Sequence, residues 1–208
     1  MSPIREQLLK VRVMPVLTVN SEAQALAVCD ALAAGGILAV EITLRTPAAL
    51  SAIRAVKAAR PDFCVAAGTV RTPQDMEAVA AAGVDFAVSP GWSPSLSAAA
   101  SALGLPFLPG VSTPSEIIQG SECGHSCFKF YPAEAVGGIP LLKAFAGPFA
   151  GVEFCPTGGI GTHNYRDYLA LPNVLCIGGS WMVDTKLIEA QQWDEIESLS
   201  RECMALGQ

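Results

Sequence analysis

The chain has 208 residues, of which 51% are hydrophobic and 15% are charged, and its formal net charge is −6. This apolar composition excludes extensive disorder, and the length suits one large domain spanning residues 1–208. The negative charge argues against a nucleic acid or an anionic membrane surface as the main partner, because either would require clustered Lys and Arg.

The start of the chain and the cysteines bear on where the protein works. The first residues, MSPIREQLLKVR, mix charged and apolar side chains and lack the apolar core of a signal peptide. No stretch approaches the roughly 20 apolar residues of a membrane helix. Seven cysteines without a repeating framework are typical of reduced thiols, and the cluster CGHSC matches no standard zinc spacing. We therefore expect a cytoplasmic protein with no membrane contact and no metal.

Along the chain, apolar runs alternate with Ala-rich segments after a short predicted helix over residues 3–11. Eight runs predict strands: residues 13–19, 38–44, 64–70, 86–90, 106–111, 127–132, 153–159 and 174–180. Segments between them show helical spacing, Ser or Thr starts and Gly ends, most clearly over residues 21–36, 46–59, 72–83 and 93–104.

Strand followed by helix, about eight times in one chain, predicts an α/β fold. The specific expectation is a single (β/α)8 TIM barrel with a short N-terminal helix. An open doubly wound sheet is the alternative. It is disfavoured because no G-x-G-x-x-G follows the first strand and no Gly-Lys-Ser/Thr phosphate loop is present.

Polar side chains within the apolar strands mark the candidate site. Parallel strands covered on both faces read as continuous apolar runs, and barrel sites lie at the C-terminal ends of the strands. Because strand side chains alternate between faces, Glu41, Thr43 and Arg45 share one face of VEITLR. By the same parity, Lys129 points opposite to Phe128. We expect the polar set to face the barrel interior.

An amine, a carboxyl and a guanidinium in one interior suggest Schiff-base chemistry. Desolvation and a neighbouring cation lower the pKa of an amine, and a neutral amine can attack a ketone. In this interpretation Lys129 is the nucleophile, Glu41 is the acid and base, and Arg45 offers a planar fork to a carboxylate. The structural alternative is a buried ion-pair network that fixes strand register.

Two glycine turns follow the last two predicted strands, in PTGGI and IGGSW. Loops at these positions of a barrel commonly bind phosphate, and glycine lets the backbone approach an anion closely. Gly158, Gly159, Gly179 and Ser180 are therefore candidates for a phosphate site. Glycine pairs that merely end strands are the simpler alternative.

Eight segments of the chain resemble, in order and spacing, the bacterial 2-dehydro-3-deoxy-phosphogluconate aldolases of the Entner–Doudoroff pathway. They are VEITLRT, AAGTV, VSPG, LPGVSTPSE, FKFYPAE, CPTGGI, NYRDYLAL and CIGGSW. The resemblance implies a homotrimeric (β/α)8 barrel without a cofactor. It also implies cleavage of 2-dehydro-3-deoxy-6-phosphogluconate (KDPG) to pyruvate and glyceraldehyde 3-phosphate, and in many members of 4-hydroxy-2-oxoglutarate (KHG) to pyruvate and glyoxylate.

The resemblance also implies roles for individual residues. Lys129 matches the Schiff-base lysine and Glu41 the glutamate that transfers protons. Arg45 and Thr69 match residues that bind the pyruvyl portion of the substrate, and Pro90 falls in the pocket-lining SPG.

Further along, Thr157 matches the threonine that contacts the substrate hydroxyl, and the two glycine turns match the phosphate site. The chain departs from the family pattern at Tyr131, where a second Phe is expected, and at Val136, where Asn is usual. Neither change removes a catalytic group, but Tyr131 alters polarity beside the lysine.

Two other functions are compatible with these residues. One is the same Schiff-base chemistry on the galactonate epimer of the substrate or on another short keto acid. The other is a non-catalytic barrel that binds a phosphorylated metabolite, in which Lys129 is only the ion-pair partner of Glu41.

Overall fold

The computed structural model describes residues 3–205, in which strands and helices alternate as predicted. The strands are β1 (Val13–Leu17), β2 (Ala39–Thr43), β3 (Cys64–Gly68), β4 (Phe86–Val88), β5 (Phe107–Leu108), β6 (Gly110–Val111), β7 (Cys127–Phe130), β8 (Glu153–Pro156) and β9 (Ile177–Gly179). The α-helices are α1 (Pro3–Val11), α2 (Glu22–Ala34), α3 (Ala49–Ala59), α4 (Pro73–Ala81), α5 (Pro94–Leu103), α6 (Pro114–Glu122), α7 (Gly138–Phe145), α8 (Tyr165–Leu169), α9 (Thr185–Glu189) and α10 (Trp193–Met204). Two short 3₁₀ helices are η1 (Glu134–Val136) and η2 (Trp181–Val183).

The helix starts follow local sequence signals. In α4 and α6 a threonine precedes a proline, and its hydroxyl accepts a hydrogen bond from the backbone N–H three residues later. An acidic side chain at that third position returns a bond to the threonine N–H, which completes a capping box in both helices. These signals are why the predicted start of α4 agrees with the structure, and the same signals mark the start of α6.

All strand pairings are parallel and fall into two sheets. One has the order β5-β4-β3-β2-β1-β9 and the other β6-β7-β8, with an isolated parallel bridge between Thr157 and Gly178. The predicted strand 106–111 is divided into β5 and β6 at Pro109, which has no N–H to donate, although its carbonyl accepts from the Lys129 N–H at 2.8 Å. These pairings make a curled parallel α/β sheet, and closure into one eight-stranded barrel stays a prediction.

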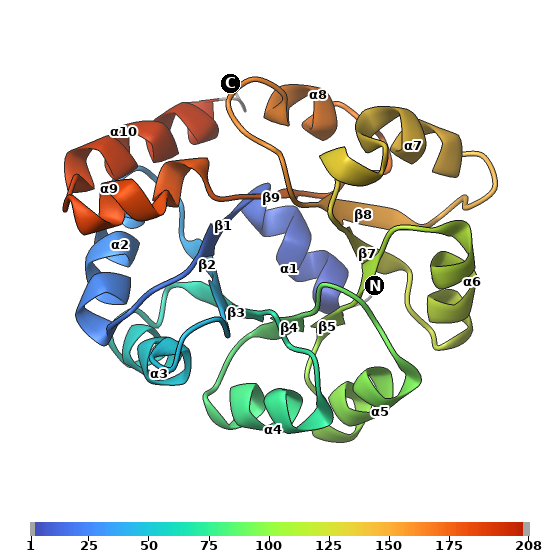
Figure 1. Cartoon of the computed structure of the whole chain (residues 1–208), viewed down its shortest axis with the longest axis horizontal. Coiled ribbons are helices and arrows are strands. Elements are labelled where there is room, and N and C mark those ends of the chain that lie inside the picture. The colour runs from blue at the N-terminus through green and yellow to red at the C-terminus, as the bar shows by residue number, and fades with distance from the viewer. Residues whose placement is uncertain (1–2, 206–208) are drawn as a thin grey trace.

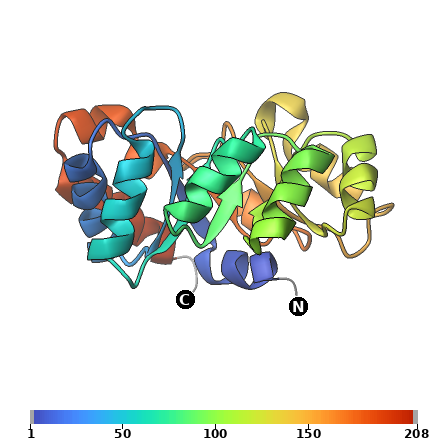
Figure 2. The same ribbon diagram turned by 90° about the horizontal axis from the view of Figure 1, so that it is seen from below.

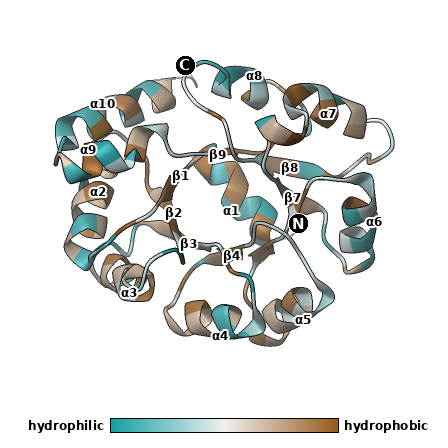
Figure 3. Ribbon diagram, viewed as in Figure 1, coloured by the Kyte–Doolittle hydropathy of each residue, from teal (hydrophilic) through white to brown (hydrophobic). Residues whose placement is uncertain are grey.

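The helices from α2 onward surround the strands, as Figure 1 shows. In the view turned by 90°, α1 lies below the strands (Figure 2). The strands β1 and β2 are hydrophobic, whereas the helices carry hydrophilic residues among apolar ones (Figure 3). None of the helices within residues 3–205 combines the length and the apolar character that crossing a bilayer requires.

Two apolar clusters lie on opposite faces of the strands. The outer cluster joins strands to the surrounding helices and contains Val40, Ile42 and Phe128. The inner cluster contains Leu8 of α1 together with inward-facing strand residues such as Cys127. The predicted alternation of side chains along β2 and β7 is therefore confirmed, and it leaves the opposite face of each strand for polar groups.

Candidate active site

A buried ion pair joins two strands that are distant in sequence. Lys129 on β7 and Glu41 on β2 are only 5% and 4% exposed, and the Lys129 Nζ donates to Glu41 Oε1 at 3.0 Å and Oε2 at 3.3 Å. The Nζ also lies 5.5 Å from the ring centroid of Tyr131. The structure thus brings together the predicted amine and carboxyl, at a distance that permits direct proton transfer.

The position of Glu41 depends on a glycine of the next strand. In the β2–β3 register Thr43 pairs with Gly68, and a Cβ on Gly68 would lie 2.2 Å from Glu41 Oε1 and 2.8 Å from its Cγ. The Thr43 hydroxyl donates to the Leu17 carbonyl at 3.0 Å, which ties β2 to β1. Gly68 on β3, which has no side chain, therefore leaves the space that the Glu41 carboxylate occupies.

A pocket of about 290 Å³ opens among the ends of β1, β8 and β9 and the loops that follow them. Six of the predicted site residues line it: Arg45, Thr157, Gly158, Gly159, Gly179 and Ser180. Lys129 and Glu41 are not among its lining residues. Tyr131 connects the two parts of the site, because it lines the pocket and its ring lies beside the Lys129 amine.

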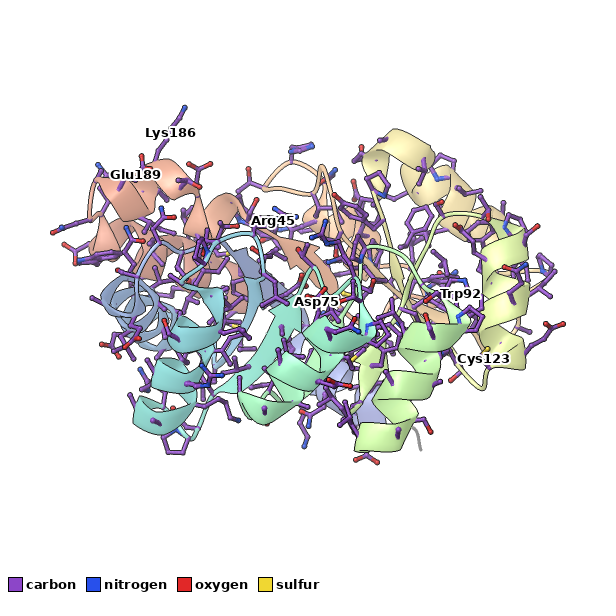
Figure 4. All side chains as sticks on the ribbon, turned by 60° about the horizontal axis from the view of Figure 1, so that its bottom comes forward. Arg45, Asp75, Trp92, Cys123, Lys186 and Glu189 are labelled. Carbon is purple, nitrogen blue, oxygen red and sulfur yellow. The ribbon has the colours of Figure 1, made fainter. Side chains whose placement is uncertain are left out.

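Arg45 lies beyond the end of β2 and is exposed. It makes no ion pair with another residue between 3 and 205. Figure 4 shows it on the upper side of the molecule, whereas Cys123 lies lower. Because Arg45 lines the pocket, its planar guanidinium is a candidate for binding an anionic group there.

Thr157 carries a buried hydroxyl without a partner. The residue is 7% exposed, and within residues 3–205 no group bonds its Oγ1. A Cβ on Gly178 would lie 2.4 Å from this oxygen, so the glycine leaves room for it. Buried hydroxyls without partners are costly, by about 1–3 kcal/mol, and are found where a ligand or ordered water completes the bonding.

Gly158 and Gly159 form the turn after β8, with φ of 106° and 75°, which glycine adopts without strain. The N–H groups of Gly159 and Ile160 donate to no acceptor in the described part of the chain, whereas the Gly158 N–H is directed toward β9 by the Thr157–Gly178 bridge. All three residues line the pocket. Successive free amides of this kind form an anion-binding concavity.

Besides Lys129 and Glu41, two further predicted site residues lie outside the lining of this pocket. Thr69 directly follows β3 and has a φ of 63°. Pro90 follows β4 and packs against Gly110, where a Cβ would lie 2.4 Å from the Pro90 carbonyl carbon. Both stand at C-terminal ends of strands, as predicted, but the structure does not join them to the glycine turns.

Comparison with known proteins identifies the family. Residues 4–199 match the family model described as "Aldolase: KDPG and KHG aldolase". The chain belongs to this family. It is accordingly an aldolase, a carbon–carbon lyase, and the resemblance seen in the sequence is confirmed.

Several relatives are similar to this aldolase over nearly its whole length. The 2-dehydro-3-deoxy-phosphogluconate aldolase of Dickeya dadantii is 49% identical, over 93% of this chain and 91% of the relative. The KHG/KDPG aldolase of Escherichia coli K12 is 50% identical, over 92% of this chain and 90% of the relative. A crystal structure of KDPG aldolase from Legionella pneumophila, with pyruvate captured at low pH as a covalent carbinolamine intermediate, has a TM-score of 0.94 and 44% identity. The match covers 97% of this chain and 98% of that chain.

The pocket also contains residues that sequence reasoning missed. Thr18 follows β1 and pairs with the Thr43 hydroxyl at 2.9 Å. It could have been found, because it is a polar residue at the end of an apolar strand, like the others that were selected. Asp184, which caps α9 by accepting the Lys186 N–H at 2.8 Å, lies in a connection whose pattern carries no such signal.

Proposed function

We propose that this aldolase is a class I enzyme that cleaves KDPG to pyruvate and glyceraldehyde 3-phosphate. The observation that carries the proposal is the buried Lys129–Glu41 pair, in which an amine and a carboxyl meet at 3.0 Å. Relatives named for this substrate, and a structural neighbour that holds pyruvate as a carbinolamine, support it. A carbinolamine forms when an amine adds to a ketone, which is the role proposed for Lys129.

The reaction begins when the Lys129 Nζ lone pair attacks the C2 ketone, after Glu41 accepts a proton from the amine. Glu41 then returns a proton to the carbinolamine hydroxyl, which leaves as water and produces an iminium. The C3–C4 bonding electrons move into this iminium to give an enamine, while Glu41 removes the proton of the C4 hydroxyl and glyceraldehyde 3-phosphate departs. Protonation at C3 and hydrolysis release pyruvate and restore Lys129.

The pyruvyl portion is bound beside the reacting amine. Arg45 and Thr69 hold its carboxylate, and a guanidinium suits this role because its planar fork can donate two parallel bonds. Pro90 lines the same region. Support for Arg45 comes from its place on the pocket and from the absence of an ion pair with any other residue between 3 and 205.

The distal portion of the substrate extends toward the glycine turns. The Thr157 hydroxyl contacts a substrate hydroxyl, which would give this buried group a partner. Gly158 and Gly159, with Gly179 and Ser180, bind the phosphate. Their support is that all four line one pocket and that the Gly159 N–H in the first turn has no acceptor within residues 3–205.

The finer architecture that we propose is one closed (β/α)8 barrel formed by residues 1–208 as a single domain. Two features favour closure: Pro109 alone separates β5 from β6, and the Thr157–Gly178 bridge connects β8 to β9. A homotrimer and a cytoplasmic location are proposed from the family resemblance.

A second substrate is favoured by the Escherichia coli relative, whose name includes KHG. We propose that the same residues cleave KHG to pyruvate and glyoxylate, because its reacting atoms C1 to C4 match those of KDPG. The galactonate epimer is supported more weakly, because the structure named for KDPGal is only 25% identical to this chain, and the non-catalytic role is not favoured.

The test is reductive trapping with pyruvate and borohydride, followed by mass mapping of the peptides. A three-carbon adduct is expected on Lys129 and not on the other four lysines, which serve as internal controls: Lys10, Lys57, Lys143 and Lys186. Glu41→Gln should lower kcat by about 10²–10⁴-fold while the adduct still forms, because the variant keeps the amine but loses the proton acceptor. An unmodified Lys129, or activity abolished by a chelator, would refute the proposal.

A further inference from the structure

The loop after β8 is attached to the loop after β7 through its backbone carbonyls. The Thr157 carbonyl accepts the Ala133 N–H at 2.8 Å, and the Gly158 carbonyl accepts the Glu134 N–H at 3.1 Å. The two loops are also closely packed, since a Cβ on Gly159 would lie 2.7 Å from the Glu134 Cβ. Two consecutive peptide groups are therefore held from outside the pocket.

The third carbonyl of the run is held by a side chain. Asn164 donates from Nδ2 to the Gly159 carbonyl at 3.2 Å, and its Oδ1 accepts the Gly161 N–H at 2.9 Å. The amide of Asn164 thereby spans the turn and is satisfied on both its donor and its acceptor side. The carbonyls of residues 157 to 159 thus receive bonds from three donors within residues 3–205. Two are the backbone N–H groups of Ala133 and Glu134, and the third is the Asn164 side chain.

Holding these carbonyls determines where the neighbouring N–H groups point. A trans peptide is planar, so its C=O and N–H point in opposite directions. The carbonyls of residues 157, 158 and 159 share their peptide groups with the N–H groups of Gly158, Gly159 and Ile160. Of these, the Gly158 N–H is directed toward β9 by the Thr157–Gly178 bridge, whereas the Gly159 and Ile160 N–H groups have no acceptor in the described chain, and both residues line the pocket.

We propose that Asn164 is a positioning residue for the phosphate: it orients the Gly159–Ile160 peptide so that the Ile160 N–H faces the substrate anion. The inference deepens the proposed function and rests on it. The Ala133 and Glu134 donors belong to the backbone, and ordinary substitutions leave them in place. Asn164 is the point at which a side-chain change can disturb this run of amides.

The consequence is a change in selectivity between the two proposed substrates. The phosphate of KDPG is on C6 and reaches the loop, whereas KHG ends at a C5 carboxylate next to the reacting C4 and is too short. Loss of the Asn164 bond should therefore weaken the reaction of KDPG more than that of KHG. A general loss of stability would lower both.

The experiment compares Asn164→Asp and Asn164→Ala with Asn173→Ala. The Asp variant keeps an oxygen that can accept the Gly161 N–H, but it loses the donor to the Gly159 carbonyl. It therefore tests the bond to Gly159 separately from the bond to Gly161. Asn173 is the matched control, because it also donates from Nδ2 to a backbone carbonyl, that of Leu142 at 2.9 Å, and does not line the pocket. The readouts are kcat/KM for KDPG and for KHG, inhibition by inorganic phosphate, and the melting temperature.

Both Asn164 variants should lower the ratio of kcat/KM for KDPG to that for KHG by about tenfold, as expected for one lost charge-assisted hydrogen bond. The inhibition constant of inorganic phosphate should rise by a similar factor. An unchanged ratio in Asn164→Asp, or an equal fall in Asn173→Ala, would overturn the inference. Failure of the aldolase mechanism itself would appear separately, as no pyruvate adduct in the unsubstituted protein, and phosphate inhibition would still decide the role of Asn164.

Discussion

At the scale of single residues, the candidate site depends on two glycines, because a residue without a side chain leaves space for a polar neighbour. Glu41 and Thr157 both reach into the interior of the curled sheet, and each faces a glycine on the neighbouring strand, Gly68 and Gly178 respectively. A polar group at such a position needs space as well as partners, because interiors are packed without voids. Gly68 in AAGTV and Gly178 in CIGGSW thus leave the space that the Glu41 and Thr157 side chains require.

Gly68→Ala should therefore impair catalysis more than folding. The new methyl group would stand 2.2 Å from Glu41 Oε1 and 2.8 Å from its Cγ and Cδ, so the Glu41 side chain must leave its rotamer and its bond with Lys129. We expect kcat to fall by at least about 10²-fold, as for loss of a general acid–base group, while pyruvate is still trapped on Lys129.

Gly147→Ala is the control for this substitution, because a Cβ there meets no atom within 4 Å and its φ lies outside the left-handed region. Equal activity of Gly68→Ala and Gly147→Ala would show that Glu41 does not need this space. Steady-state kinetics and a melting curve on both variants make the comparison.

At the scale of elements, local signals predicted the helices well and the connections poorly. The α4 and α6 boundaries follow from threonine, proline and an acidic residue at fixed spacing. The alternation along β2 and β7 predicted which side chains meet inside. Arg45 was assigned by the same alternation, but it lies past the end of β2, where strand parity no longer determines direction. The split at Pro109 could have been predicted, since proline cannot donate to a strand pairing.

The α6 capping box should make stability dependent on pH. The Glu116 carboxylate accepts the N–H groups of Ser112 at 2.7 Å and Thr113 at 2.8 Å. Burial alone would raise the pKa of Glu116, but these donors outweigh it and lower the pKa below the ordinary value of 4.5. The unfolded chain then binds the proton more readily. The stabilisation is complete above pH 4.5 and is lost as the pH falls through the lower, folded-state pKa.

Glu116→Gln should accordingly lower the free energy of unfolding by about 1 kcal/mol at pH 7, and the difference from the unsubstituted protein should shrink below pH 4. Urea unfolding at several pH values measures it. Glu77→Gln, at an exposed position of α4, is the control and should change little. A difference that persists unchanged at low pH would contradict the assignment to the charged carboxylate.

At the scale of the whole molecule, the repeated pattern of an apolar strand followed by a helix allowed the architecture to be predicted from the sequence. Eight apolar runs and their intervening helices predict parallel strands with a site at one end. The structure places Lys129 and Glu41 within β7 and β2, and the glycine turns at the ends of β8 and β9. That these residues form one active site stays a proposal. The sequence could not predict that Lys129 and Glu41 fall outside the lining of the pocket, or that Asp184 falls within it. Which residues line the pocket depends on the conformation of the loops that follow the strands, and these loops have no periodic sequence pattern.

The inner cluster and α1 close the other end of the structure. Leu8 is 1% exposed and packs with inward-facing residues of β1 and β7, Met14 and Cys127 among them, whereas Leu9 beside it is 44% exposed. Cys127 belongs to the same inward face of β7 as Lys129. The helix that begins the described chain therefore completes the packing beneath the proposed catalytic pair.

Leu8→Ala should destabilise the protein by about 2–5 kcal/mol, because it removes a buried side chain and leaves a cavity that neighbouring strands cannot fill. Leu9→Ala, with nearly the same sequence context but an exposed side chain, should cost less than about 0.5 kcal/mol. Denaturant unfolding of both variants gives the two values. If α1 were only a surface appendage, the substitutions would have similar small effects. A large difference between adjacent leucines would show that the helix belongs to the cooperative unit that holds the β7 lysine in place.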